Sequence, residues 1–205
     1  KNKKLDISLY RDKPLSFFSE NFLSTAKDQG ACRYLQQLLD SNTEETVKTL
    51  FPPLCKNILN LINDLFANYL IQKLVIALDQ EQIYVILNII SSNFFHICCD
   101  PHGTRVIQKL IFYLSSEKNK NYFYELVKPL IIPLLKDLNG TYIVQKFAIQ
   151  NMKEYGLKIY DIIIKNSTEL CKNRHGFCVI QKYIEVRDPI MIPKLLDKLI
   201  EDSLQ

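Results

Sequence analysis

The amino-acid sequence predicts an all-α protein, a solenoid of short helical repeats stacked side by side. Three observations lead to this fold class. A twelve-residue pattern recurs along the chain at near-constant spacing, the apolar residues between its copies follow helical spacing, and no stretch alternates apolar and polar residues as a strand would. The chain has 205 residues, 47% of them hydrophobic and 23% charged, with 5 glycines and 8 prolines, which is the composition of a folded chain rather than a disordered one.

The repeated pattern is D/N-x-x-G/A-x-x-Φ-Φ-Q-K/Q-Φ-Φ, where Φ is mostly apolar. Its copies begin at residues 28, 64, 100, 137 and 173, in steps of 36, 36, 37 and 36 residues. These copies define five repeats, which we number one to five. A unit this short cannot bury its own apolar face, so neighbouring repeats must stack. The copies are DQGACRYLQQLL, DLFANYLIQKLV, DPHGTRVIQKLI, DLNGTYIVQKFA and NRHGFCVIQKYI.

Each copy of the pattern is expected to form a helix. Its first residue, Asp or Asn, stands where an N-cap belongs, because the side-chain oxygen can accept a hydrogen bond from an otherwise unpaired backbone N–H. Pro101 then stands at the favoured first helical position of repeat three. The stretches between copies, such as residues 118–136 and 153–166, have the apolar spacing of amphipathic helices, so each repeat is expected to hold about three short helices.

Polar and planar side chains interrupt the apolar run of each predicted helix at three fixed positions. A first-edge position and a second-edge position are four residues apart and share one helix face, and a stacking position directly follows the first. The second-edge position is glutamine in every repeat, and the stacking position is Arg or Tyr in four of the five. The first-edge, stacking and second-edge residues are, from repeat one to repeat five, Cys32, Arg33 and Gln36; Asn68, Tyr69 and Gln72; Thr104, Arg105 and Gln108; Thr141, Tyr142 and Gln145; and Phe177, Cys178 and Gln181.

This combination of side chains matches the chemistry of unstacked nucleobases. A glutamine amide offers a donor and an acceptor that can pair with the edge of a base, and Tyr rings and Arg guanidinium groups can stack on base faces. Stacked repeats would line these positions up along one surface, so that each repeat could hold one base. The net charge of +4 permits a polyanionic partner without requiring one, so the prediction of nucleic-acid binding rests on the pattern.

At these residues the sequence resembles the Pumilio (PUF) family, through GACRYLQQLL, FANYLIQKLV, HGTRVIQKLI, NGTYIVQKFA and HGFCVIQKYI. The resemblance implies a right-handed solenoid arc of three-helix PUF repeats, whose concave face binds single-stranded RNA with the 3′ end on repeat one. It also implies a single repeat domain over residues 1–205, with an N-terminal capping half-repeat and a partial sixth repeat over 188–205. Family domains usually have eight repeats, so the chain is expected to be part of a longer domain or a short member. Helices that contact RNA are expected near 28–39, 64–75, 100–111, 137–148 and 173–184.

The base code of the family, carried over position by position, implies the RNA sequence 5′-N-A-A-U-A-3′. The Asn–Gln pair of repeat two matches the uracil pair of the family, and the Cys–Gln pair of repeat one matches an adenine pair. The Thr–Gln pairs of repeats three and four are nearest the adenine class. Phe177 and Cys178 depart from the pattern, because Phe177 cannot hydrogen-bond a base edge and Cys178 is a poor stacking surface. The base at repeat five therefore stays open.

The resemblance further implies a monomeric, cytoplasmic protein that regulates the stability or translation of messenger RNAs through elements of their 3′ untranslated regions. Protein co-repressors are expected on the convex face. Two alternatives stay open. One is a divergent PUF-like protein of ribosome biogenesis that binds nucleic acid without strong sequence preference. The other is a HEAT- or armadillo-like protein-binding scaffold, although those repeats usually run ~40–47 residues.

The sequence favours neither an enzyme nor a metalloprotein. It has no G-x-G-x-x-G, G-x-S-x-G, H-E-x-x-H or P-loop pattern, so no catalytic or cofactor-binding residue is assigned. The six cysteines form no C-x-x-C pair and no spaced histidine pair accompanies them, so reduced thiols are expected rather than a metal site. No segment has eighteen uninterrupted apolar residues, so no membrane span is expected.

Overall fold

The computed structural model describes residues 7–186 and 191–203. Within these ranges the regular elements are all helices, which confirms the predicted all-α class. The chain divides into two compact units, Lys1–Lys120 and Asn121–Gln205. Each unit contains stacked helices of the predicted repeats.

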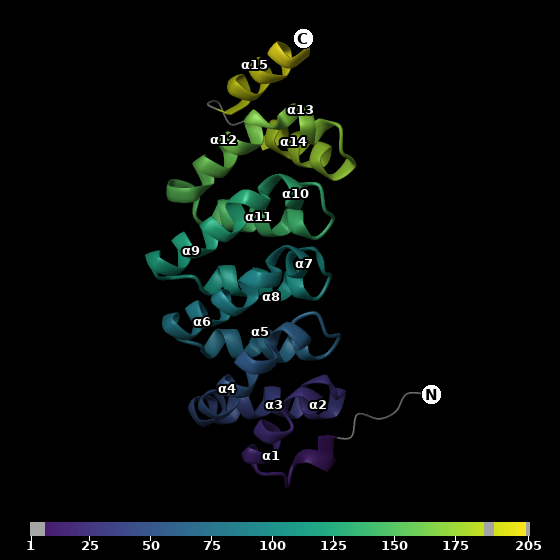
Figure 1. Ribbon diagram of the computed structural model, residues 1–205, viewed down its shortest axis with the longest axis vertical. Helices are drawn as coiled ribbons and strands as arrows, with labels where there is room; N and C mark the ends of the chain where they lie inside the picture. The colour runs from purple at the N-terminus through teal and green to yellow at the C-terminus, as the bar shows by residue number, and fades with distance from the viewer. Residues whose placement is uncertain (1–6, 187–190, 204–205) are drawn as a thin grey trace, which may run out of the picture. The chain divides into compact units, whose positions relative to one another are not determined.

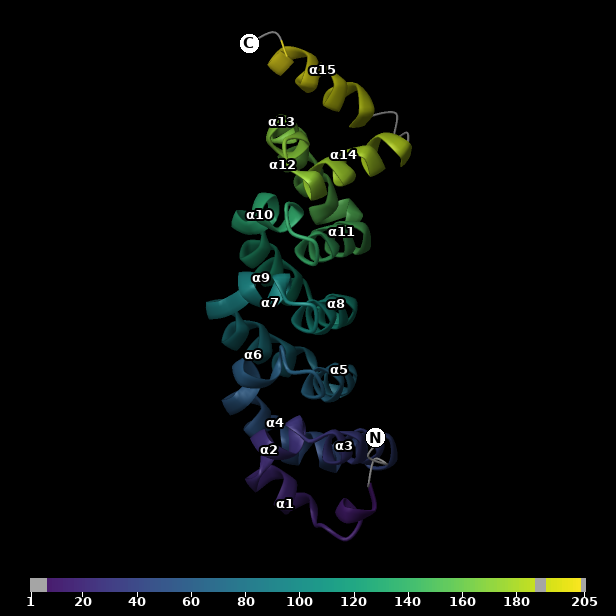
Figure 2. The ribbon, with the colours of Figure 1, turned by 90° about the vertical axis from the view of Figure 1, so that its right-hand side faces the viewer.

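Unit 1 holds the N-terminal segment and the first three motif helices, a name we give to the helices that carry the repeated pattern. Motif helices α3, α5 and α8 lie in successive layers (Figure 1), and the view turned by 90° shows them on one side, with α4, α6 and α7 on the other (Figure 2). Helix α5 packs against both α3 and α8. The elements of unit 1 are η1 (Ile7–Tyr10), α1 (Leu15–Glu20), α2 (Phe22–Lys27), α3 (Gln29–Ser41), α4 (Thr43–Leu61), α5 (Ala67–Ala77), α6 (Gln80–Ile90), η2 (Ser91–Asn93), α7 (Phe94–Cys99), α8 (Gly103–Tyr113) and the start of α9 (Glu117–Val127).

Unit 2 holds the fourth and fifth motif helices, α11 and α14. Helix α10 packs against α11, and α13 packs against α14. Helix α15 covers most of the predicted partial sixth repeat, whose residues 188–190 and 204–205 lie outside the described residues. The elements of unit 2 after α9 are η3 (Lys128–Leu130), α10 (Ile131–Leu135), α11 (Gly140–Gln150), the π-helical turn η4 (Met152–Gly156), α12 (Leu157–Lys165), α13 (Ser167–Cys171), α14 (Arg174–Val186) and α15 (Met191–Ser203).

The first residue of each pattern copy caps the motif helix that follows, as the sequence predicted. In repeat three, Asp100 Oδ1 accepts hydrogen bonds from the backbone N–H groups of His102 and Gly103, both at 2.8 Å. Pro101 lies in the turn before the helix rather than at its first position, because these two bonds close a short turn and α8 begins only at Gly103. Loss of one such cap costs about 1 kcal/mol. The equivalent caps are Asp28 to Ala31, Asp64 to Phe66 and Ala67, Asp137 to Asn139 and Gly140, and Asn173 to His175 and Gly176.

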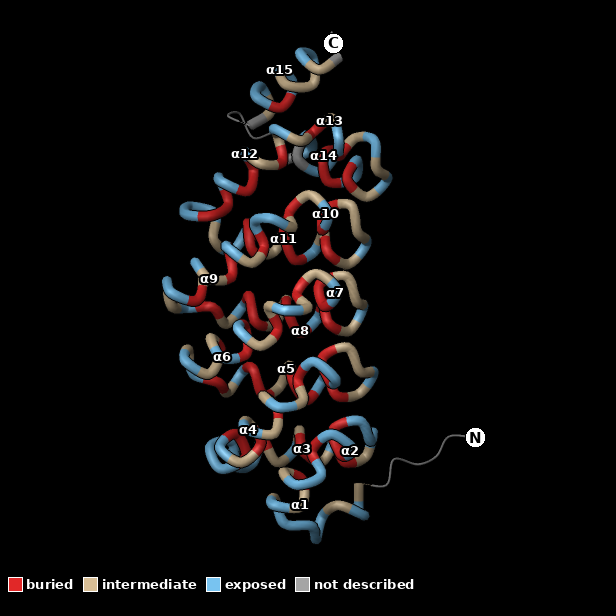
Figure 3. Tube along the Cα trace, viewed as in Figure 1, coloured by how far each residue is buried: buried red, intermediate tan, exposed pale blue. Residues whose placement is uncertain are grey.

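The apolar pairs of the pattern supply the core of each layer. Val106, Ile107, Leu110 and Ile111 on α8 are fully buried, as predicted, and α8 packs against α5 and α7. Figure 3 shows buried residues recurring along the motif helices and exposed residues along the outer turns. Each fully buried aliphatic side chain contributes roughly 1.5–3 kcal/mol. The stacked layers therefore hold the polar face of every motif helix in a fixed orientation.

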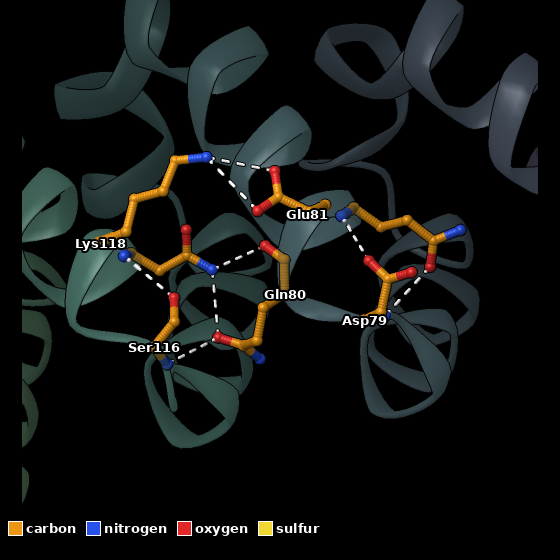
Figure 4. Close-up of polar contacts among 7 residues, drawn as sticks. Asp79, Gln80, Glu81, Ser116 and Lys118 are labelled. Carbon is orange, nitrogen blue, oxygen red and sulfur yellow. Dashed lines mark hydrogen bonds and ion pairs between the residues drawn. The ribbon is translucent and has the colours of Figure 1, made fainter.

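A polar clasp joins repeats two and three within unit 1 (Figure 4). The side chain of Gln80, at the start of α6, reaches the turn that follows α8. Its Oε1 accepts hydrogen bonds from the backbone N–H groups of Ser115 at 3.1 Å and Ser116 at 3.0 Å, and its Nε2 donates to the carbonyl of Tyr113 at 3.0 Å. One side chain thus satisfies three backbone groups of the neighbouring repeat.

Asn119 completes the clasp, and its removal is expected to lower the free energy of unfolding by about 2 kcal/mol. Its fully buried side chain donates from Nδ2 to the Gln80 carbonyl at 2.8 Å and to Gln80 Oε1 at 3.1 Å. Urea unfolding of Asn119→Ala followed by circular dichroism measures the loss. Glu81→Gln is the control, because it removes only the exposed Lys118–Glu81 ion pair and should cost about 0.5 kcal/mol or less. Equal losses in the two variants would contradict the assignment.

The segment Gln80–Cys99 is long and apolar enough, by length and composition alone, to cross a membrane. In this structure it forms three elements, α6, η2 and α7. Its apolar side chains Ile83, Ile86, Leu87 and Ile90 are fully buried within unit 1. The apolar side chains that give this segment its hydropathy therefore pack inside the protein.

Candidate nucleic-acid interface

The predicted base-contacting positions lie at different depths on the motif helices. The first-edge side chains Cys32, Asn68 and Thr104 are buried, with 2%, 0% and 4% of their surface exposed, and Thr141 is half-buried. The second-edge glutamines of repeats one to four are half-buried, and the stacking residues beside them are exposed. Each of these four motif helices therefore presents a glutamine above a buried or half-buried side chain and next to an exposed one.

In repeats one to four, the second-edge glutamine is held by the first-edge residue one turn earlier. Its Nε2 donates a hydrogen bond to the oxygen or sulfur of that side chain, so three chemically different first-edge residues serve as the same kind of acceptor. The bonds are Gln36 to Cys32 Sγ at 3.4 Å, Gln72 to Asn68 Oδ1 at 3.0 Å, Gln108 to Thr104 Oγ1 at 3.5 Å, and Gln145 to Thr141 Oγ1 at 2.9 Å.

The orientation of the Gln72 amide follows from the surroundings of Asn68. Asn68 Nδ2 lies 2.8 Å from the carbonyl oxygen of Asp64 and 3.0 Å from that of Leu65, and only an amide nitrogen can donate to both. Asn68 Oδ1 must then face Gln72, so the Gln72 group facing it must be the donor Nε2. This leaves the Gln72 carbonyl oxygen and its second N–H for a partner, as one acceptor beside one donor.

Cys32 is joined to the next repeat as well as to its own glutamine. Its thiol donates to the carbonyl oxygen of Phe66 at 3.2 Å and accepts from Gln36. Burial raises the pKa of the Cys32 thiol above its ordinary value, so the group is a neutral thiol at pH 7. Sequence reasoning missed the Phe66 carbonyl, because every residue has a carbonyl and no side-chain pattern distinguishes this one.

The planar stacking residues are exposed beside the glutamines. Tyr69 and Tyr142 expose 48% and 49% of their surface, and Arg33 and Arg105 are also exposed. In unit 1, Arg105 Nη1 donates a hydrogen bond to Tyr69 Oη across repeats two and three at 3.3 Å. The stacking groups of repeats two and three are therefore neighbours, and a base inserted between them must displace their hydrogen bond.

Repeat five differs from the other four in its first-edge and stacking residues and in the exposure of its glutamine. Phe177 exposes 46% of its surface, and Cys178 and Gln181 are exposed as well. Because the Phe177 side chain has no hydrogen-bonding atom, it cannot hold Gln181 as the first-edge residues hold the other glutamines. The first-edge residue of repeat five therefore does not fix the glutamine amide as those of repeats one to four do.

All six cysteines are free thiols. Across residues 7–186 and 191–203, no group of three or more His, Cys, Asp or Glu side chains is placed to hold a metal ion. The chemistry that the interface offers is hydrogen bonding and stacking.

A sequence model of the Pumilio-family RNA binding repeat matches residues 21–51, 57–91, 93–127 and 166–200. These segments contain the motif helices of repeats one, two, three and five. Residues 128–165 fall between the matched segments, yet the motif helix there, α11, has the same glutamine-to-first-edge bond as the matched repeats. Repeat four is therefore more divergent in sequence than in the geometry of its polar face.

Curated relatives and solved structures show the same similarity. The chain is 32% identical over 190 residues to the Pumilio domain-containing protein C6G9.14 of Schizosaccharomyces pombe, covering 93% of the chain and 28% of that protein. It is 32% identical over 182 residues to the putative pumilio homolog 7, chloroplastic, of Arabidopsis thaliana, covering 87% of the chain and 28% of that protein. The chain thus spans about a quarter of the length of these relatives.

Two solved structures match the fold with a TM-score of 0.78 each. The Puf4 RNA binding domain, bound to the HO endonuclease RNA 3′ UTR recognition sequence, is 34% identical, with 87% of this chain and 55% of that chain covered. The RNA-binding domain of yeast Puf5p, bound to SMX2 RNA, is 29% identical, with 96% and 55% covered. These matches confirm the predicted class of helical repeats. The chain therefore belongs to the Pumilio family of RNA-binding repeat proteins.

Proposed function

We propose that the chain binds single-stranded RNA selectively, with one base at each motif helix. The observation that carries this proposal is the hydrogen bond from the second-edge glutamine to the first-edge side chain, which recurs in four repeats beside exposed planar groups. The held amide offers a base edge one acceptor and one donor, and the planar groups offer stacking faces. The similar Puf4 and Puf5p domains were solved bound to RNA, which supports the proposal.

The proposed RNA core is 5′-N-A-A-U-A-3′, with its 3′ end at repeat one. The acceptor and donor of Gln72 complement the N–H and one carbonyl oxygen of uracil, and the same pair of groups complements the amino group and ring nitrogen of adenine. Glutamine alone therefore does not separate uracil from adenine. The first-edge residue must supply the difference, and the assignment of uracil to repeat two rests on the base code of the family.

We propose a role in post-transcriptional control, through elements in the 3′ untranslated regions of messenger RNAs, for a cytoplasmic monomer that engages protein co-repressors. The structure of the similar Puf4 domain bound to a 3′ UTR recognition sequence supports a 3′ untranslated region as the target. A divergent, weakly selective binder is the second candidate, because Phe177 of repeat five has no side-chain atom that could accept a hydrogen bond from Gln181. The family match favours both over a HEAT-like scaffold.

Fluorescence polarisation with a labelled RNA ending in 5′-AAUA-3′ and a scrambled RNA of equal length tests the proposal. We expect the first RNA to bind about tenfold tighter or more, since each mismatched base costs ~1–3 kcal/mol. Equal affinity for both RNAs would favour the weakly selective binder. Binding to neither RNA would overturn the proposed function.

Gln36 and its neighbour Gln37 provide a matched pair of glutamines for testing the interface. Gln36 is half-buried and bonded to Cys32, whereas Gln37 is exposed and lies outside the first-edge and second-edge positions. Gln36→Ala is expected to weaken RNA binding about tenfold, because it removes both groups that face the last 3′ base. Gln37→Ala should change the Kd less than about twofold. Equal effects in polarisation titrations would place the interface elsewhere on α3.

A further inference from the structure

An ion pair between repeats one and two lies at the border of the proposed base-binding face. Lys73 directly follows the second-edge Gln72, and Asp40 lies one helical turn after the second-edge Gln36. Lys73 Nζ and Asp40 Oδ2 are 2.5 Å apart. At the junction of repeats one and two, Asp40 of α3 therefore neutralises the charge of Lys73 of α5.

The junction between repeats two and three lacks the acidic partner. Helix α5 packs against α8 as α3 packs against α5, so Lys109 takes the place of Lys73, and Ile76 takes the place of Asp40. Ile76 exposes 47% of its surface and cannot accept a hydrogen bond. Lys109 makes no ion pair among the residues that the structure describes, and its Nζ lies 6.0 Å from the centroid of the Tyr113 ring. This junction therefore has a cation without a counter-charge.

The same replacement recurs at the equivalent sequence positions of unit 2. Ile149 stands at the position equivalent to Asp40 and exposes 68% of its surface. Lys182, which follows the second-edge glutamine of repeat five, stands at the position equivalent to Lys73 and is exposed. The loss of the acid is thus found in both units rather than at one repeat alone.

We infer that Lys109 contacts a phosphate of bound RNA, whereas Lys73 does not, because Asp40 already neutralises it. Lys109 lies one turn after the stacking residue Arg105 and directly after Gln108, so its long side chain starts beside the proposed base position. The backbone of single-stranded RNA brings one negative charge with each nucleotide to this place. The assignment rests on the proposed function and adds a phosphate contact to it.

The dependence of RNA affinity on salt separates the two lysines. A cation that neutralises one phosphate of a single strand changes the slope of log K against log salt by about 0.7. Lys109→Gln is expected to make that slope shallower by about 0.7 and to weaken binding at low salt about threefold. Lys73→Gln is the matched control, and it should leave the slope unchanged. Equal changes in the two variants, or an unchanged slope for Lys109→Gln, would overturn the inference.

Two converse variants strengthen the test. Ile76→Asp places an acid at the junction of repeats two and three. It should make the slope of log K against log salt shallower, as Lys109→Gln does, and combining the two substitutions should make it no shallower still. Asp40→Asn frees Lys73, so it should steepen the slope by about 0.7 and tighten binding. If Asp40→Asn leaves the slope of log K against log salt unchanged, the inference is contradicted.

These outcomes are distinct from failure of the proposed function. If the unmodified chain binds no RNA, the proposed function and this inference both fall. If it binds RNA selectively and the four variants leave the slope unchanged, only the phosphate contact falls. Far-UV circular dichroism on each variant checks that its overall helix content is unchanged, which is expected because all the changed side chains lie at the surface or in half-buried positions.

Discussion

Changing Asn68 to serine together with Gln72 to glutamate is expected to move the preference of repeat two from uracil to guanine, at the penultimate 3′ base. Guanine presents two neighbouring N–H donors on its Watson–Crick edge, which one carboxylate can accept together, whereas uracil would oppose the carboxylate with carbonyl oxygens. A serine hydroxyl can donate to the new carboxylate and hold it, as Asn68 now holds the Gln72 amide. A bidentate pair is worth ~1–3 kcal/mol of discrimination, so the ratio of the two Kd values should reverse by about tenfold or more.

Polarisation titrations with RNAs ending in 5′-AAUA-3′ and 5′-AAGA-3′ measure this change. The single variants show why both substitutions are needed. Gln72→Glu alone would set a carboxylate against Asn68 Oδ1, while Asn68 Nδ2 stays bonded to two backbone carbonyls, so binding to both RNAs should weaken. Asn68→Ser alone keeps the amide of Gln72 and should not favour guanine.

The equivalent double change in repeat one, Cys32→Ser with Gln36→Glu, controls for position along the RNA. It should alter the preference at the last 3′ base and leave the penultimate base as it was. An unchanged preference at repeat two, or a change at a different base, would show that the repeats do not contact the bases in the order that we propose.

The motif helices could be predicted from the sequence because their signals are local. Each Asp or Asn cap contacts backbone groups two or three residues away, so the pattern that predicts the helix also contains the contact that begins it. The buried pairs, such as Val106 and Ile107, follow from helical spacing alone. The face on which the glutamines lie follows from the same spacing.

Contacts between repeats could not be predicted in this way. Asn119 occupies the position at which repeats one and two have the buried apolar residues Val47 and Ile83, so the repeat pattern suggests a core side chain there. Its partner Gln80 is 39 residues away, and nothing near Asn119 in the sequence marks that partner. The burial of Asn68 could not be predicted for a similar reason. Helical spacing gives the face on which a side chain lies, but not how closely the next repeat covers it.

Repeat four shows a local departure that periodicity also misses. The apolar spacing over 153–166 predicts a regular amphipathic helix, but the chain first makes the π-helical turn η4 and α12 begins only at Leu157. The carbonyl of Asn151 accepts from the N–H groups of both Tyr155 at 2.9 Å and Gly156 at 3.0 Å. A Cβ on Gly156 would lie 2.7 Å from the Ala148 carbonyl oxygen, so the missing side chain allows this close turn.

Replacing Gly103 with valine is expected to destabilise unit 1 by about 3 kcal/mol or more. A Cβ at Gly103 would lie 2.3 Å from Asn63 Oδ1 and 2.5 Å from the carbonyl oxygen of Ile97. The Asn63 side chain can turn away, but the Ile97 carbonyl belongs to α7 and moves only if that helix moves. The same close approach recurs at two other glycines. A Cβ at Gly140 would lie 2.9 Å from the carbonyl oxygen of Leu134, and a Cβ at Gly176 would lie 2.6 Å from that of Leu170. Close packing, rather than an unusual backbone conformation, therefore requires glycine here.

Urea unfolding of Gly103→Ala and Gly103→Val measures the effect as a graded series, with valine the more damaging. The control is Ala67→Gly in repeat two, where a buried alanine occupies the equivalent position. Its cost should be about 1 kcal/mol, from helix propensity and the loss of one buried methyl group. Variants that remain folded must shift α8 away from α7, and this shift would carry Arg105 and Gln108 out of line with repeat two. Their RNA selectivity should fall at the base of repeat three while that at repeat one persists. Unfolding of Gly103→Val at the wild-type urea concentration would mean that α7 and α8 are not packed this closely.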